Sequence, residues 1–145
     1  MDAGKIGLGI VLALGLAWTL WQKHQDHALT AAIRAMTDEY GFITFAPPNG
    51  GRVDEVLVAA AINCPGEAAV HADQLAQDLK DEGVAVRRIS SFEFTASPDA
   101  DPEEFVKVHN RVMSQDAPMV FVNGKVKSKP SMGEVLAEYR LLARP

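Results

Sequence analysis

The most informative segment of the chain reads Val56-Leu-Val-Ala-Ala-Ala-Ile-Asn-Cys-Pro-Gly-Glu67. Its first seven residues, Val56–Ile62, form an unbroken apolar run whose length and branched side chains predict a strand buried on both faces. Pro65 opens a segment with helical periodicity, and proline is favoured in the first turn of a helix. We therefore place Cys64, the only cysteine of the chain, where a buried strand turns into a helix.

Two interpretations of Cys64 follow from this position. Free N–H groups and the positive end of the helix dipole can lower the pKa of a thiol, and the thiolate is the nucleophilic form. In the other interpretation the cysteine is a small apolar residue that fills a tight turn. The segment alone leaves both open.

The composition limits the classes of function. The chain has 145 residues, of which 48 % are hydrophobic and 23 % charged, and this length allows one domain with a core of its own. A net charge of −5 without a stripe of basic residues argues against nucleic-acid binding. A single cysteine excludes an internal disulfide and a multi-cysteine zinc site. We expect no metal and no bound cofactor.

The N-terminal segment Ile6–Trp21 carries no charged residue. Its length is at the short end for a helix that spans a bilayer, and Trp18 and Trp21 resemble an interfacial aromatic anchor. We expect a single-pass membrane anchor in contact with lipid. A signal peptide cleaved near Gly15-Leu16-Ala17 and a buried soluble helix are the alternatives. Basic residues near both ends nearly balance, so the side of the membrane stays open.

The next part of the chain is expected to connect this anchor to the main domain. Gln22 to Tyr40 is predicted as an amphipathic helix that stops at Gly41, and Phe42–Phe45 as a short strand. A loop of proline, asparagine and glycine follows. The expected organisation is an anchor over 1–21, a juxtamembrane helix, strand and loop over 22–53, and a folded domain over 54–145.

Strands and helices alternate in the rest of the chain. This order predicts an α/β fold in which a mixed sheet carries helices on both faces. After the first strand we expect a helix from about Pro65 to Glu82, a strand over Val84–Ile89 and a loop over Ser90–Ala100 with a strand extension at Phe92 and Phe94. A helix capped by Asp101 follows and ends near Met113. The chain then forms strands over Met119–Val122 and Lys125–Lys127, joined by a hairpin at Asn123-Gly124, and a last helix opened by a capping box at Ser131–Glu134.

From Val56 onward this order resembles the thioredoxin-like superfamily, and most closely a glutaredoxin. Cys64-Pro65 stands at the strand-to-helix turn where the family keeps Cys-Pro-x-Cys. The block from Ala117 to Lys125 resembles the proline, strand and hairpin of that family, and the terminal helix follows in the right place. The resemblance covers about residues 54 to 142 and implies a three-layer thioredoxin-like fold.

The resemblance also implies a site. Cys64 would be the catalytic thiol, with Pro65, Ala117 and Pro118 as substrate-binding residues. Pro118 would be cis and lie beside the cysteine, and the backbone of Ala117 would pair with a thiol-bearing peptide such as glutathione. Without the resemblance, a trans proline that opens a strand is the ordinary expectation.

The chain departs from the family at several positions. Glu67 stands where the second cysteine of a dithiol enzyme would resolve a mixed disulfide. Ser128–Ser131 replaces the segment that holds the charged end of glutathione. His71 is about 10 Å along the helix axis from Cys64, and we expect it and His109 at the surface or at an edge.

Two functions are therefore expected. The first is a membrane-anchored protein that exchanges thiols and disulfides through one cysteine, with glutathione or a protein thiol as co-substrate. The alternative is a redox-inactive thioredoxin fold that binds a partner protein at the membrane.

Overall fold

A computed structural model of the chain describes residues 3–52, 54–62 and 66–142. The chain divides into two compact units, Met1–Ala35 and Met36–Pro145. The first unit is helical, and the second holds all the strands and the remaining helices. We describe each unit by itself.

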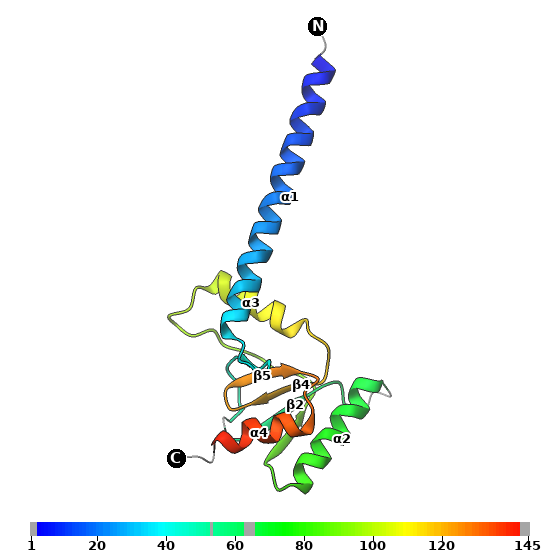
Figure 1. The fold of residues 1–145 in the computed structure, drawn as a ribbon, viewed down its shortest axis with the longest axis vertical. Helices are drawn as coiled ribbons and strands as arrows, with labels where there is room; N and C mark the ends of the chain where they lie inside the picture. Colours follow the sequence, from blue (N-terminus) through cyan, green and yellow to red (C-terminus); the bar gives the residue numbers. More distant parts are fainter. Residues whose placement is uncertain (1–2, 53, 63–65, 143–145) are drawn as a thin grey trace. The chain divides into compact units, whose positions relative to one another are not determined.

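Helix α1 runs without interruption from Ala3 to Met36 (Figure 1). It ends four residues before the predicted end at Tyr40. The carboxylate of Asp38 accepts hydrogen bonds from the backbone N–H groups of Tyr40, at 3.0 Å, and Phe42, at 2.9 Å. An aspartate that bonds nearby backbone groups in this way competes with the helix. In the part of the chain that is described, no helix is both long and apolar enough to cross a bilayer.

The second unit is built on one mixed five-stranded sheet. The strands lie in the order β1-β5-β4-β2-β3. β2 and β3 are parallel, and the other neighbours are antiparallel. The strands are β1 (Ile43–Thr44), β2 (Val56–Ala59), β3 (Val86–Ile89), β4 (Met119–Val122) and β5 (Lys125–Ser128).

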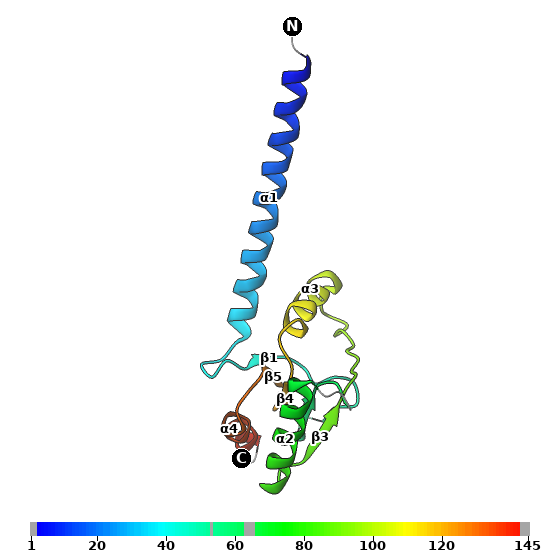
Figure 2. The ribbon, with the colours of Figure 1, turned by 90° about the vertical axis from the view of Figure 1, so that its right-hand side faces the viewer.

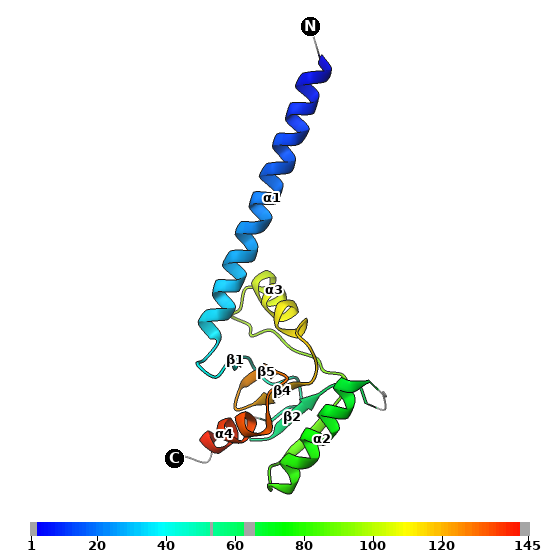
Figure 3. The ribbon, with the colours of Figure 1, turned by 45° about the vertical axis from the view of Figure 1, so that its right-hand side comes forward.

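Helices cover both faces of this sheet, as the alternation of elements predicts. Helix α2 (Glu67–Asp81) and helix α4 (Met132–Leu142) pack on one face. Helix α3 (Pro102–Met113) lies on the other side of the strands, as Figures 2 and 3 show. The second unit is therefore a three-layer α/β structure.

The main core lies between the sheet and the helices α2 and α4. Val56 and Val58 of β2 and Val120 and Val122 of β4 point into it, and every residue of β2 and β4 is buried. Burial on both faces is what the unbroken apolar run of β2 predicts. The helices contribute small and branched side chains, which are Ala72, Leu75, Ala76, Leu79 and Val135.

Three local signals in the sequence are confirmed. The carboxylate of Asp101 accepts a hydrogen bond from the N–H of Glu104 at 2.8 Å and caps α3. Asn123 and Gly124 have φ angles of 53° and 68°, as a tight hairpin turn requires. Before α4, the carboxylate of Glu134 accepts bonds from the backbone N–H and the hydroxyl of Ser131, which completes the predicted capping box.

Other boundaries differ from the prediction. β2 ends at Ala59 rather than Ile62, and Ala61 and Ile62 are exposed. Phe92 and Phe94 form no strand extension, and both rings pack against Phe121 on the α3 side of the sheet. Aromatic side chains that alternate in sequence can share a face without belonging to a strand.

The folded unit begins earlier than the expected residue 54. Phe42 is 1 % exposed and belongs to the core, and β1 pairs with β5. Lys125 of β5 contacts the Asp38 carboxylate at 2.8 Å. Of the segment 22–53 that was expected to be a juxtamembrane connection, the part after Met36 thus contributes an edge strand of the sheet and a core residue, whereas residues 22–35 belong to α1 and the first unit.

Candidate functional site

The end of β2 meets the start of β4, and this places part of the predicted site. Ala59 is paired with Met119 in the antiparallel register. Pro118 directly precedes Met119, the first residue of β4. The Ala117–Pro118 peptide bond is cis, as the resemblance implies. Pro118 is less than 2 % exposed, and Ala117 is half-buried against the core.

The backbone around Pro118 is held from Lys129, the residue that follows β5. The carbonyl of Pro118 accepts a hydrogen bond from the N–H of Lys129 at 2.8 Å. The ammonium group of Lys129 donates a hydrogen bond to the carboxylate of Asp116 at 2.9 Å. This hydrogen bond lowers the pKa of Asp116 below its usual value. Asp116 and Pro118, on either side of Ala117, are therefore both tied to Lys129.

Cys64 and Pro65, the other two predicted site residues, lie outside the described residues. The chain is described again from Gly66, which precedes α2 without a side-chain cap, and Glu67 is the first, exposed residue of the helix. The structure thus brings Ala117 and Pro118 to the end of β2. It also places the start of α2, three residues after the position of Cys64.

Arg88 is a site residue that the sequence analysis missed. Its side chain is 13 % exposed, and its guanidinium donates to the carbonyl of Val58 at 2.8 Å and to the carbonyls of Ala60 and Ala61 at 3.4 Å. The same group contacts the carboxylate of Asp73 on α2 at 2.8 Å. Arg88 therefore joins the end of β2 to α2, next to the segment that carries Cys64. The signal in the sequence that could have pointed to Arg88 is the presence of two adjacent arginines, Arg87 and Arg88, inside a predicted strand.

The neighbouring arginine has a separate role. The guanidinium of Arg87 contacts the carboxylate of Glu55 at 2.6 Å and the carbonyl of Gly50 at 2.8 Å. The hydrogen bond from Arg87 to the Glu55 carboxylate outweighs the opposing effect of burial and lowers the pKa of Glu55. Arg87 therefore fastens the loop before β2 rather than the loop after it.

An aromatic cluster lies on the α3 side of the sheet. Its centre is His109, whose ring lies 4.7 Å from the ring of Phe94 and within 6.0 Å of two further phenylalanine rings. His109, which was expected at the surface or at an edge, is half-buried, and its Nδ1 atom is buried without a hydrogen-bond partner among the described residues. His71, in contrast, is exposed as expected. The members of the cluster are Phe45, Phe92, Phe94, Phe105, His109 and Phe121.

Across the residues that the structure describes, no three histidine, cysteine, aspartate or glutamate side chains are grouped in a way that could hold a metal ion. Comparison of the chain with protein-family models, curated proteins and solved structures finds no match.

Proposed function

We propose that the second unit is a thioredoxin-like domain. Its support is the order of elements from β2 onward, which runs strand, helix, strand, helix, proline, strand, hairpin, strand, helix. This is the order on which the sequence resemblance rests. The three layers and the position of Pro118 directly before β4 agree with it.

We further propose that Cys64 exchanges thiols and disulfides. The observation that carries this proposal is the register of β2 and β4. It pairs Ala59, five residues before the cysteine, with Met119, the residue after Pro118. In the reaction the Cys64 thiolate attacks one sulfur of a disulfide, forms a mixed disulfide and releases the other sulfur as a thiolate. An external thiol, such as glutathione or a protein cysteine, then attacks the mixed disulfide and regenerates Cys64.

The neighbouring residues would align the substrate. Pro65 would contact the substrate beside the thiol, and the backbone of Ala117 would pair with the peptide that carries the substrate sulfur. Arg88 fixes the carbonyl groups of Ala60 and Ala61, which limits the freedom of the chain as it enters the cysteine segment. A preorganised site of this kind lowers the entropy lost on reaching the reactive geometry.

The rate of alkylation tests the proposed thiol. We expect iodoacetamide to modify Cys64 in the folded chain at neutral pH at least about tenfold faster than free cysteine, because a thiol of lowered pKa is more ionised. The Cys64→Ser variant gives the background, since it has no other cysteine. A rate equal to or below that of free cysteine would remove the catalytic role.

A second cysteine tests the position of the thiol. If Cys64 lies at the start of α2, Glu67→Cys should form a reversible intramolecular disulfide under mild oxidation. Glu82→Cys, at the far end of the same helix, is the matched control and should stay reduced within the chain. Mass spectrometry that found both thiols free in the Glu67→Cys variant would contradict the proposed geometry.

The alternative function is a redox-inactive binding module. It is favoured by the single cysteine and by Glu67 in place of a resolving cysteine. Under this alternative Cys64→Ser keeps the biological activity, whereas thiol exchange predicts its loss.

We also propose that the segment Ile6–Trp21 attaches the chain to a membrane. The support is the sequence, in which sixteen consecutive residues carry no charge. The full chain should sediment with membranes and resist extraction by alkaline carbonate, and a chain without residues 1–21 should not.

A further inference from the structure

The chain contains two Asn-Gly pairs, and the structure holds them in different ways. The backbone nitrogen of a glycine can attack the side-chain amide of an asparagine that precedes it, because glycine has no side chain to block the approach. One pair, Asn49-Gly50, lies in the loop before β2. The other, Asn123-Gly124, forms the turn between β4 and β5. Their surroundings decide which of the two reacts.

Asn49 and Gly50 are exposed at the centre of a tight turn. The N–H of Gly51 donates to the carbonyl of Pro48 at 2.8 Å and closes this turn. Gly50 has a φ of 77°, and a Cβ added to it would meet nothing within 4 Å. The Asn49 amide donates to the hydroxyl of Thr95 at 3.1 Å, and this bond is exposed. Water can therefore replace the bond when the side chain moves.

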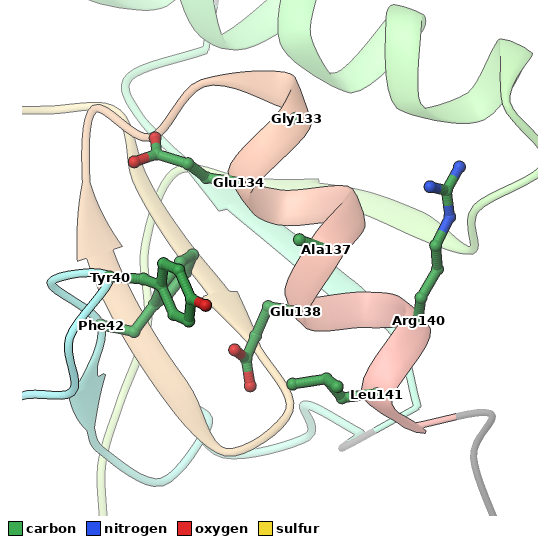
Figure 4. A pocket seen from close by; sticks show the side chains of 8 residues that line it. All are labelled: Tyr40, Phe42, Gly133, Glu134, Ala137, Glu138, Arg140 and Leu141. Atoms are coloured by element: carbon green, nitrogen blue, oxygen red, sulfur yellow. The ribbon is translucent and has the colours of Figure 1, made fainter.

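Asn123 is held more firmly. Its Nδ2 atom donates at 2.8 Å to the carboxyl group of Glu138, which is only 3 % exposed. Figure 4 shows this carboxyl group extending from α4 toward the hairpin. Asn123 and Gly124 are themselves half-buried in the turn. If the Asn123 amide turned toward the backbone, the buried Glu138 would lose a donor that water replaces poorly.

We propose that Asn49 deamidates in the folded protein and that Asn123 is protected, although glycine follows both. The Gly50 nitrogen attacks Cγ of Asn49 and loses its proton to solvent. An N–Cγ bond forms, the Cγ–Nδ2 bond breaks, and ammonia leaves. Water then opens the resulting succinimide, at the main-chain carbonyl to give isoaspartate or at Cγ to give aspartate. This site is independent of the proposed function of Cys64.

Isoaspartate at position 49 is expected to loosen the loop before β2. It adds one atom to the main chain in a loop that is closely packed. A Cβ on Gly51 would lie 2.8 Å from Cδ1 of Leu57, which is buried in the core. The carbonyl of Gly50 accepts from the guanidinium of Arg87 at 2.8 Å. A longer main chain cannot keep both contacts, and loss of ammonia removes the donor to Thr95.

Peptide mapping by mass spectrometry tests the proposal on the full chain after incubation in mildly alkaline buffer. Asn49 should lose its amide at least about fivefold faster than Asn123, because the half-buried bond of Asn123 is costlier to break than the exposed bond of Asn49. In concentrated urea the two rates should approach each other, since neither turn is formed. Equal rates in the folded chain, faster reaction of Asn123, or a ratio that urea leaves unchanged would overturn the proposal.

Trypsin tests the expected loosening, because the side chain of Arg52, directly after Gly51, is 73 % exposed. Chain in which an isoaspartate methyltransferase detects isoaspartate should be cleaved after Arg52 several-fold faster than fresh chain. Fresh Asn49→Asp, whose main chain is not lengthened, and incubated Asn49→Gln, whose longer side chain cyclises far more slowly, should both be cleaved like fresh chain. Equal cleavage of fresh and isoaspartate-containing chain, or equally fast cleavage of Asn49→Asp, would overturn the role of the longer main chain.

Discussion

At the scale of single residues, Arg88 joins several parts of the fold. The carbonyl groups of Val58 in β2 and of Ala60 and Ala61 just after it accept bonds from its guanidinium, which also contacts the Asp73 carboxylate on α2. The side chain is largely buried, so these bonds are poorly replaced by water when the arginine is removed.

Arg88→Met should therefore lower the free energy of unfolding by about 2–3 kcal/mol, since the arginine's bonds to the carbonyls are lost. Urea denaturation followed by circular dichroism measures the change. Arg52→Met is the control, because Arg52 is exposed and pairs with Asp54, two residues away. It should leave the urea midpoint unchanged. An equal loss of stability in both variants would mean that the bonds of Arg88 to β2 and α2 do not stabilise the fold.

Glu134 makes the capping box of α4 sensitive to acid. The hydrogen bond from Lys127, together with the bonds from Ser131, lowers the pKa of Glu134 from 4.5 to about 2. Because the folded-state pKa is depressed, the stabilisation is fully present above pH 4.5. It is lost as the pH falls from there toward 2.

Stability measured against pH tests this behaviour of Glu134. Glu134→Gln should be less stable than the unaltered chain above pH 4.5, and the difference should shrink as the pH falls toward 2. Thermal unfolding across this range gives the measurement. Glu103→Gln, which alters an exposed glutamate of α3, is the control and should show little difference at any pH. A Glu134 difference that does not depend on pH would contradict the pKa shift.

At the scale of elements, the β4–β5 hairpin depends on its turn. Gly124 has a φ of 68°, a conformation that costs an L-residue about 1–2 kcal/mol. Gly124→Ala should destabilise the fold by about that amount.

Gly133→Ala is the opposite case, because Gly133 lies in α4 and an added Cβ would meet nothing within 4 Å. We expect it to stabilise by about 0.5–1 kcal/mol, measured by urea denaturation. The same sign for both variants would be inconsistent with these backbone conformations.

Elements with short-range signals could be predicted from sequence. Asp101, Asn123-Gly124 and Ser131 each act on residues one to three positions away, so their effect is visible locally. The end of α1 was missed because the Asp38 bonds that end it compete with a helical pattern that continues to Tyr40. The behaviour of Phe94 was missed because its partner Phe121 is distant in sequence.

The candidate site shows the same division. The cis bond before Pro118 was expected through a resemblance, not from the residues themselves. Arg88 takes its partners from β2, the segment after it and α2, so its contacts could not be read from its neighbours in sequence. The only hint was the presence of two adjacent arginines inside a predicted strand.

At the scale of the whole molecule, the structure sets the start of the second unit at Met36. Removing residues 1–35 should leave a unit that unfolds at nearly the same temperature. Removing residues 1–53 also deletes Phe42, β1 and Asp38. Loss of a buried phenylalanine alone costs about 3–5 kcal/mol, so the melting temperature should fall by at least about 12 °C. Thermal unfolding by circular dichroism compares the two truncations, and equal melting temperatures would place the boundary at residue 54.

The two outer strands of the sheet differ in how they meet solvent. β1 has two residues, and β3 carries Arg87, whose side chain is 46 % exposed. Unpaired backbone groups on an outer strand invite another chain to add to the sheet, and short length and positive charge both oppose such addition. Neutralising Arg87 would therefore expose the protein to self-association into aggregates, even where each chain could still fold.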